Sequence, residues 1–122
     1  MTQQTFIITG ASFGMLAIIL GAFGAHALKK LLSEDQLKSF ETGVKYQMYH
    51  AIVLLLLGFF HNFSTTVMYL CFTIGIILFS FSIYGLVISD AKEKKLKFLG
   101  PITPIGGLLF VVGWLLIILQ AI

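Results

Sequence analysis

The sequence predicts an all-α integral membrane protein, a four-transmembrane-helix bundle with a short amphipathic interfacial helix between helices 1 and 2. Apolar residues make up 58% of the 122 residues, charged residues make up only 11%, and long uncharged stretches separate the charges. An ordinary soluble domain carries roughly 25% charged residues, more than twice this fraction, so most of the surface of this protein is expected to face lipid and not water. The length suits a single domain, residues 1–122.

The uncharged stretches are the predicted transmembrane spans. A span needs about 20 apolar residues to cross a hydrocarbon core of about 30 Å. The first stretch has no charge and ends where Lys29 and Lys30 begin. The second is the shortest and carries His50 and His61 near its ends, where headgroups can hydrate them. The predicted spans are residues 6–28, 46–63, 65–89 and 98–122.

The lysines predict the orientation of these spans. Residues 61–65 are the only link between spans two and three, which suits a tight helical hairpin and antiparallel neighbours. All eight basic residues are lysines, and this topology puts them on one side of the bilayer. The positive-inside rule then predicts both termini outside the cytoplasm, for a multi-pass protein of the bacterial inner or plasma membrane. The lysines are Lys29, Lys30, Lys38, Lys45, Lys92, Lys94, Lys95 and Lys97.

A capping box predicts a helix inside the first connection. Ser33 is the expected N-cap, Gln36 completes the box, and Leu32 with Leu37 supplies the hydrophobic staple. Gly43 is the expected bend between this helix and span two. Apolar residues recur after the cap at helical spacing, so the helix should be amphipathic and lie at the interface: Leu37, Phe40, Val44 and Met48.

Small residues supply the predicted contacts between spans. Lipid tails are as apolar as leucine, so helices in membranes associate mainly through close backbone approach. Packing within one bundle is the economical use of these glycines, and a homodimer contact is the alternative. The predicted packing residues are Gly10, Gly14, Gly21 and Gly24 in span one, and Gly106, Gly107 and Gly113 in span four.

Span four begins with two prolines and contains the indole N–H of Trp114, which needs a hydrogen-bond partner. Pro101 and Pro104 lie in its first turn, where a missing N–H has no partner to lose. Trp114 lies past the middle of the span, too deep for an interfacial anchor. We therefore expect its indole N–H to find a hydrogen-bond partner within the bundle.

A cluster of polar side chains is predicted at the cytoplasmic level of the membrane. His26 closes span one and His50 opens span two, so antiparallel spans could make them neighbours. Such a cluster could bind a lipid headgroup, a small ligand or a proton. The alternative is that its members hydrogen-bond one another and only hold the helices together. The candidates are His26, Tyr46, Gln47, Tyr49, His50 and Thr103.

Several kinds of chemistry lack the residues they need. The single Cys71 lies in an apolar run and supplies neither a disulfide nor a cysteine metal site. Haem would need two histidines facing one another across a cavity, and no Gly-x-Ser-x-Gly nucleophile elbow occurs. Lysine without arginine is a poor basis for reading nucleic acid. We therefore expect no enzyme, no metal, no cofactor and no nucleic-acid partner.

The expected role is non-enzymatic. The lysine-rich connections and the polar cluster should organise anionic lipid headgroups at the cytoplasmic face, or serve as an accessory or scaffold component of a membrane-protein complex or homo-oligomer. The alternative is a small transporter or channel in which His26 and His50 gate or relay protons. Membrane transporters of that kind use a titratable carboxylate, whereas all five carboxylates here lie in the two lysine-bearing connections.

Three local patterns carry a family resemblance. They are GAFGAH at residues 21–26, YQMYH at 46–50, and GPITPIGG at 100–107 followed by GW at 113–114. In order and spacing, the chain resembles the domain-of-unknown-function 423 family, the YgdD-like and YwdK-like small membrane proteins. It departs from that pattern at FSIY, residues 81–84, where a more serine- and glycine-rich version is expected. The resemblance implies a compact plasma-membrane protein and no established activity.

Overall fold

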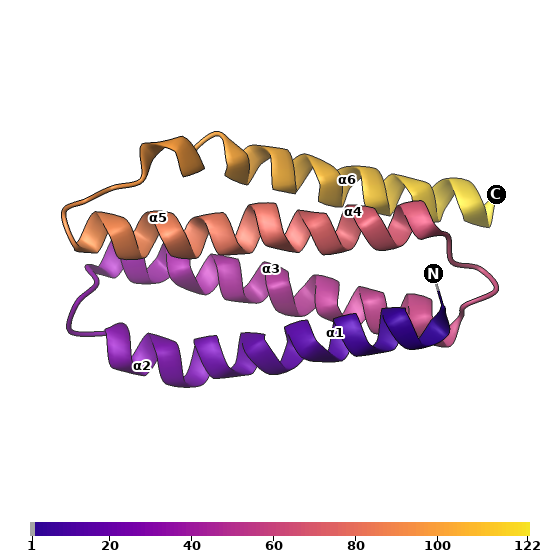
Figure 1. Cartoon of the computed structure of the whole chain (residues 1–122), viewed down its shortest axis with the longest axis horizontal. Coiled ribbons are helices and arrows are strands. Elements are labelled where there is room, and N and C mark those ends of the chain that lie inside the picture. The colour runs from indigo at the N-terminus through magenta and orange to yellow at the C-terminus, as the bar shows by residue number, and fades with distance from the viewer. Residues whose placement is uncertain (1) are drawn as a thin grey trace.

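The computed structural model describes residues 2–122, and among these residues it contains helices and no strand. Four long helices run side by side along the length of the molecule (Figure 1). In chain order the elements are α1 (Gln3–Ile18), η1 (Ile19–Gly24), α2 (Ala25–Leu28), α3 (Glu34–Phe59), α4 (Thr66–Ile76), η2 (Ile77–Phe81), α5 (Ser82–Ala91), η3 (Lys97–Leu99) and α6 (Ile102–Ala121).

Two of the long helices contain a π-helical segment. The segment η1 joins α1 to α2 in one continuous helix, Gln3–Leu28, which we call the α1–α2 helix. The segment η2 likewise joins α4 to α5 in the α4–α5 helix, Thr66–Ala91. The widened turns do not end either helix, so each remains long enough to cross a bilayer.

The helices lie in the order α1–α2, α3, α4–α5, α6 across the molecule, and successive helices are antiparallel (Figure 1). Both ends of the chain and the connection at residues 60–65 lie at one end of the bundle. The connections at residues 29–33 and 92–96 lie at the opposite end, which we call the lysine end. All eight lysines are exposed. Five lie in these two connections, Lys97 and Lys38 lie shortly beyond them, and Lys45 lies about 17 Å into α3.

Among residues 2–122, three helices are long and apolar enough to cross a membrane, namely Gln3–Leu28, Thr66–Ala91 and Lys97–Ala121. They correspond, within three residues at each end, to the predicted first, third and fourth spans. Helix α3 has 26 residues, which is also sufficient length, but its first turns are charged. A crossing by α3 therefore stays a prediction.

The predicted interfacial helix is not a separate element. Helix α3 runs without interruption from Glu34 to Phe59, so it joins the predicted amphipathic helix to the predicted second span, which ends at Phe59 and not at residue 63. No proline interrupts these residues. Gly43 is not a bend: it is buried in mid-helix, where an added Cβ would lie 2.7 Å from Cε1 of Tyr84. This glycine permits close packing.

The start of α3 is as predicted. The Ser33 side chain accepts a hydrogen bond from the Gln36 backbone N–H at 3.2 Å, and Gln36 Oε1 accepts one from the Ser33 N–H at 2.9 Å. Leu32 and Leu37 pack in the same apolar cluster, which confirms the hydrophobic staple. Because the cap satisfies N–H groups that have no partner inside the helix, it fixes where α3 begins.

Two clusters of buried side chains form the core. The larger one lies between α1, α3, α4 and α6, toward the end of the bundle that holds the chain termini, and consists of Phe6, Val53, Leu54, Leu57, Met68, Phe72, Ile76 and Phe110. The smaller one lies toward the lysine end and consists of Leu32, Phe40, Tyr84 and Val87. The buried side chains therefore continue along most of the length of the bundle.

The predicted packing glycines of span one face α3 to different degrees. An added Cβ would lie 2.9 Å from the Ala51 carbonyl oxygen at Gly10, and 3.0 Å from Val44 Cγ1 at Gly21. At Gly24 the nearest atom would be in the Phe40 ring, 3.5 Å away, and Gly14 has 3.9 Å of clearance. The close approaches of this helix are therefore at Gly10 and Gly21.

Span four shows the same contrast. A Cβ at Gly113 would lie 2.8 Å from the Phe72 ring, and one at Gly106 would collide with the backbone of Phe79. Gly107 has 3.6 Å of clearance to the Phe79 ring, so its position tolerates a side chain. Pro101 is the N-cap residue of α6, and Pro104 lies in its first turn.

Candidate functional site

His50 lies deep in the bundle and not at the start of its helix. Helix α3 begins at Glu34, so His50 is about 24 Å along the axis at 1.5 Å per residue. Its side chain is 4% exposed. The sequence placed His50 at the membrane surface because the second span was expected to begin near residue 46, after a separate interfacial helix, whereas one helix runs from Glu34 to Phe59.

Both ring nitrogens of His50 are hydrogen-bonded. Nδ1 lies 2.6 Å from the Tyr46 carbonyl oxygen, and Nε2 lies 3.1 Å from the indole Nε1 of Trp114. Because an indole N–H can only donate, Nε2 must accept, and Nδ1 carries the hydrogen that it donates to Tyr46. The ring also stacks flat on Phe110, with centroids 3.6 Å apart and 3° between the planes. The geometry therefore describes a neutral imidazole. The hydrogen-bond partner that Trp114 was expected to find within the bundle is His50.

Gln47 joins three helices. Its side chain is fully buried; Nε2 donates to the Phe13 carbonyl oxygen of α1 at 2.9 Å, and Oε1 accepts from the Tyr84 hydroxyl of α5 at 2.7 Å. Tyr46 and Tyr49, on the same helix, are exposed beside it, with ring centroids 5.8 Å apart. Gln47 therefore has the arrangement of a structural polar residue, with both ends of the amide satisfied.

Thr103 and His26 lie toward the lysine end. The Thr103 hydroxyl forms a hydrogen bond with the Ser82 hydroxyl, which ties the first turn of α6 to α5. His26 is exposed in α2. Gly14, and not His26, is the residue of the α1–α2 helix that lies level with His50, because it faces Met48 and Ala51.

The two histidines are therefore separated. From Gly14 to His26 the α1–α2 helix rises about 18 Å at 1.5 Å per residue. The structure brings Tyr46, Gln47 and His50 together on α3, but it does not bring His26 or Thr103 to them. A proton relay that uses both histidines has no shared site.

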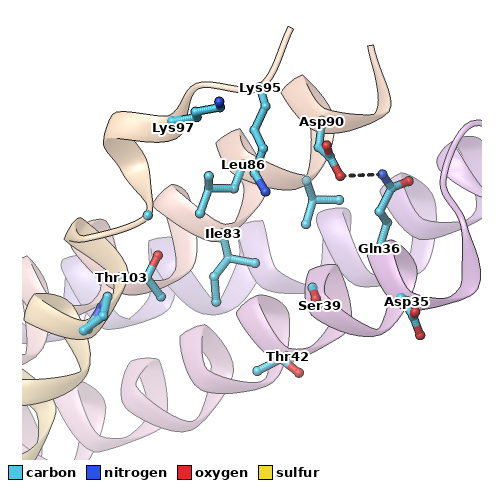
Figure 2. Close-up of a pocket in the computed structure, with 13 residues that line it drawn as sticks. Asp35, Gln36, Ser39, Thr42, Ile83, Leu86, Asp90, Lys95, Lys97 and Thr103 are labelled. Atoms are coloured by element: carbon cyan, nitrogen blue, oxygen red, sulfur yellow. Dashed lines mark hydrogen bonds between the residues drawn. The ribbon is translucent and has the colours of Figure 1, made fainter. Parts of the chain in front are cut away.

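A groove opens at the lysine end between α3, α5 and the start of α6 (Figure 2). Its volume is about 790 Å³. One wall belongs to α3, the floor to α5, and the other wall to the connection before α6 and the first turn of that helix. The lining residues are Asp35, Gln36, Ser39, Thr42, Ile83, Leu86, Val87, Asp90, Lys95, Lys97, Gly100, Thr103 and Pro104.

Opposite charges line this groove. Gln36 Nε2 donates to Asp90 Oδ2 at 2.9 Å and so joins α3 to α5 at one end of the groove. Figure 2 shows the Lys95 side chain reaching from the connection down into the groove, with Lys97 on the same wall and Asp35 on the far one. The groove can therefore offer cations to a phosphate and carboxylates to an amine.

Sequence reasoning identified the lysines, the cap at Gln36 and Thr103, but it missed this groove. Ser39 and Thr42 follow Asp35 at helical spacing on one face of α3, which was the available signal. The contribution of Asp90 depends on how α5 is rotated against α3, and no local pattern in the sequence reports that rotation.

Comparisons with known proteins agree with the resemblance in the sequence. A family model described as "Protein of unknown function (DUF423)" matches residues 20–107. The chain is 42% identical over 121 residues to a UPF0382 membrane protein of Staphylococcus aureus (strain bovine RF122 / ET3-1), covering 96% of this chain and 94% of that relative. It is 39% identical over 126 residues to the UPF0382 membrane protein YwdK of Bacillus subtilis (strain 168), covering 98% of each. No solved structure matches the chain.

Proposed function

The chain belongs to the DUF423 family, and from its likeness to UPF0382 membrane proteins we propose that it is a non-enzymatic multi-pass membrane protein whose lysine end binds anionic lipid headgroups. The observation that carries this proposal is that exposed lysines gather at one end of the bundle, with only Lys45 farther along α3. Each lysine near an anionic leaflet contributes about 1 kcal/mol, so together they form a strong electrostatic surface.

A fourth crossing by α3 is part of the proposal. The α1–α2 and α4–α5 helices run in the same direction, and both can cross a membrane (Figure 1). The chain must therefore return from one end of the bundle to the other between them, and α3 makes this return. Its last half, from Tyr46 to Phe59, carries no charge. A four-span protein keeps both termini on the side away from the lysines.

The positive-inside rule supports a cytoplasmic lysine end, in the inner or plasma membrane of a bacterium. The inner leaflet surface is also where anionic lipids attract lysine-rich segments. A protein held by headgroups at that face suits an accessory or scaffold role beside other membrane proteins.

Spin-labelled lipids test the headgroup preference. The full chain is reconstituted in phosphatidylcholine bilayers with traces of spin-labelled phosphatidylglycerol or phosphatidylcholine, and electron paramagnetic resonance measures the fraction of label that the protein immobilises. We expect a severalfold preference for phosphatidylglycerol that weakens as salt is added. A variant with glutamine at positions 29, 30, 92 and 94 should lose most of this preference; those four lysines lie outside the groove of Figure 2.

A matched control removes negative charge from the same end. Replacing Glu34, Glu41 and Glu93 by glutamine should raise the preference for phosphatidylglycerol, because the repulsion falls while the lysines stay. Equal immobilisation of the two labels by the unmodified chain would contradict the proposal, as would an unchanged preference in the lysine variant.

A further inference from the structure

The groove at the lysine end is the first of three hollows that follow one seam. A second hollow of about 590 Å³ lies beside it, between α3 and α6 over Phe79 of η2. A third, of about 340 Å³, follows toward the connection at residues 60–65 and shares Val53 and Trp114 with the second. All three have α3 on one side.

The lining residues of the seam advance in helical steps. On α3 they pass from Thr42 in the first hollow to Tyr46 in the second, one turn later. On α6 they pass from Thr103 to Gly107, also one turn later. Because both walls continue without a gap of more than one turn, the hollows form one groove, which we call the α3–α6 groove.

The chemistry of the α3–α6 groove changes along its length. At the lysine end, charged and hydroxyl side chains line the groove together with Ile83, Leu86 and Val87 of α5. The middle is lined by aromatic and apolar side chains, with the edge of His50 between them. The far part is lined by apolar and aromatic residues alone: Val53, Leu56, Leu57, Phe60, Phe63, Trp114 and Ile117. A charged end followed by an apolar channel matches an amphiphile that lies along the helices.

We propose that the α3–α6 groove binds one phospholipid of the lysine-side leaflet, and that the headgroup carries both a phosphate and a primary ammonium. The apolar part runs on α3 from Tyr46 to Leu57, about 17 Å. This is close to half of a hydrocarbon core of about 30 Å, which is the depth of one leaflet. An acyl chain from the lysine side therefore fills it.

The charges of the first hollow select the headgroup. Lys95 and Lys97 on one wall suit the phosphate, which needs cations. Asp35 and Asp90 repel a headgroup whose only charge is negative, but they accept hydrogen bonds from a primary ammonium. Gln36 holds one oxygen of Asp90 and leaves the other for the ligand. A quaternary ammonium has no N–H to donate, so the groove distinguishes ethanolamine-type from choline-type headgroups.

Gly107 keeps the middle of the groove open. A Cβ there would meet only the Phe79 ring at 3.6 Å, so a larger side chain fits the bundle and projects into the groove. Trp114 lines α6 two turns farther on, and its hydrogen bond to His50 holds the indole in the wall. The acyl chain would therefore pass directly beside the only tryptophan of the protein.

Quenching of Trp114 fluorescence tests the site in the unmodified chain. Phosphatidylethanolamine, phosphatidylglycerol and phosphatidylcholine with the same brominated acyl chains are each added at a few per cent of a phosphatidylcholine bilayer. We expect brominated phosphatidylethanolamine to quench Trp114 at least fivefold more effectively per molecule than the other two, with a saturable dependence. Equal quenching by all three lipids would overturn the proposal.

Variants then separate the headgroup from the chain. Asp90→Asn should remove the preference for phosphatidylethanolamine over phosphatidylglycerol, since the ammonium loses the negative charge of its acceptor. Gly107→Leu should lower the retention of phosphatidylethanolamine about tenfold by native mass spectrometry, whereas Ala11→Leu, on the exposed outer face of α1, adds a similar bulk without effect. Gly107→Val is the second groove variant, and helicity by circular dichroism checks the fold of each.

The groove proposal rests on the proposed lipid-binding function, but the experiments can refute it independently of the proposal for the lysine end. The glutamine variant at positions 29, 30, 92 and 94 keeps Lys95 and Lys97, so it should still retain phosphatidylethanolamine while losing the preference for anionic lipid. Retention of phosphatidylethanolamine that Gly107→Leu and Gly107→Val leave unchanged would overturn the groove proposal, whatever the spin-label result.

Discussion

The indole N–H of Trp114 donates to Nε2 of His50 across 3.1 Å, and this hydrogen bond joins α6 to α3 across the seam that separates them. The same imidazole ring donates from Nδ1 to the Tyr46 carbonyl oxygen and stacks on the ring of Phe110. Histidine in a membrane interior is often taken as a proton carrier, but here both nitrogens are committed. The pair fixes the spacing of two helices.

A double-mutant cycle should detect this bond. Trp114→Phe leaves the buried Nε2 of His50 without its donor, and His50→Phe leaves the indole N–H of the half-exposed Trp114 without its acceptor, so each should lower the thermal stability of the protein in detergent. The double variant should be less destabilised than the sum of the two, with a coupling of about 0.6 kcal/mol and at most about 1.7 kcal/mol, as is usual between membrane helices. Strictly additive effects would show that the bond contributes nothing.

Tyr84→Phe should destabilise the protein more than Tyr49→Phe does. Without the Tyr84 hydroxyl the buried Oε1 of Gln47 has no donor, which costs about 1–3 kcal/mol. Tyr49 is 53% exposed, so loss of its hydroxyl should be nearly neutral. Thermal or denaturant unfolding of the two variants side by side gives the comparison, and equal midpoints would contradict it.

Two adjacent glycines of α6 should respond oppositely to alanine. A Cβ at Gly106 would come within 2.7 Å of the Leu78 carbonyl carbon, and backbone atoms cannot move aside as a flexible side chain does. Gly106→Ala should therefore separate α6 from η2 and lower the melting temperature. Gly107→Ala has room and gains helix propensity of about 1 kcal/mol, so its melting temperature should be unchanged or higher. Similar losses in both variants would refute the close approach at Gly106.

Reporter fusions should place the C-terminus outside the cytoplasm. In bacterial cells, alkaline phosphatase fused after Ile122 should be active and green fluorescent protein dark, because the proposed orientation places the lysine end in the cytoplasm and the C-terminus lies at the opposite end of the bundle. Fusions in the loop after Ala91 should behave in the opposite way. A fluorescent C-terminal fusion would overturn the orientation, although not the bundle itself.

Much of the fold could be predicted from the sequence, because its signals are local. Uncharged stretches longer than 20 residues identified three of the long helices, and the cap at Ser33 identified the start of the fourth. The local signal could not tell whether the first turns of α3 lie on the membrane surface or pack alongside the other helices of the bundle. Lys38, Glu41 and Lys45 are exposed on one face while Phe40 is buried on another, and this pattern is the same in a helix that lies on a membrane and in one that stands beside other helices.

The candidate site was less predictable because it depends on how helices are rotated and shifted against one another. Ser80 donates to the Gly43 carbonyl oxygen, and Tyr84 donates to Gln47, yet each pair is separated by 37 residues. His50 was expected beside His26 because the second span was expected to begin near residue 46 as a separate helix, whereas α3 begins at Glu34. A shift of a dozen residues along an α-helix moves a side chain by about 18 Å, which is enough to transfer it from the membrane surface to the bundle interior.

Because the first turns of α3 are charged, the apolar surface is shorter along α3 than along the α1–α2 helix. On the outer side of α1–α2, 26 uncharged residues give about 39 Å of apolar surface, whereas on α3 the 14 residues from Tyr46 to Phe59 give about 21 Å. With α3 as the proposed fourth span, a bilayer around the protein would thin beside α3, or Lys45 would extend its stem toward the headgroups. The molecule would then act as a local wedge in the membrane, with its thin edge at α3.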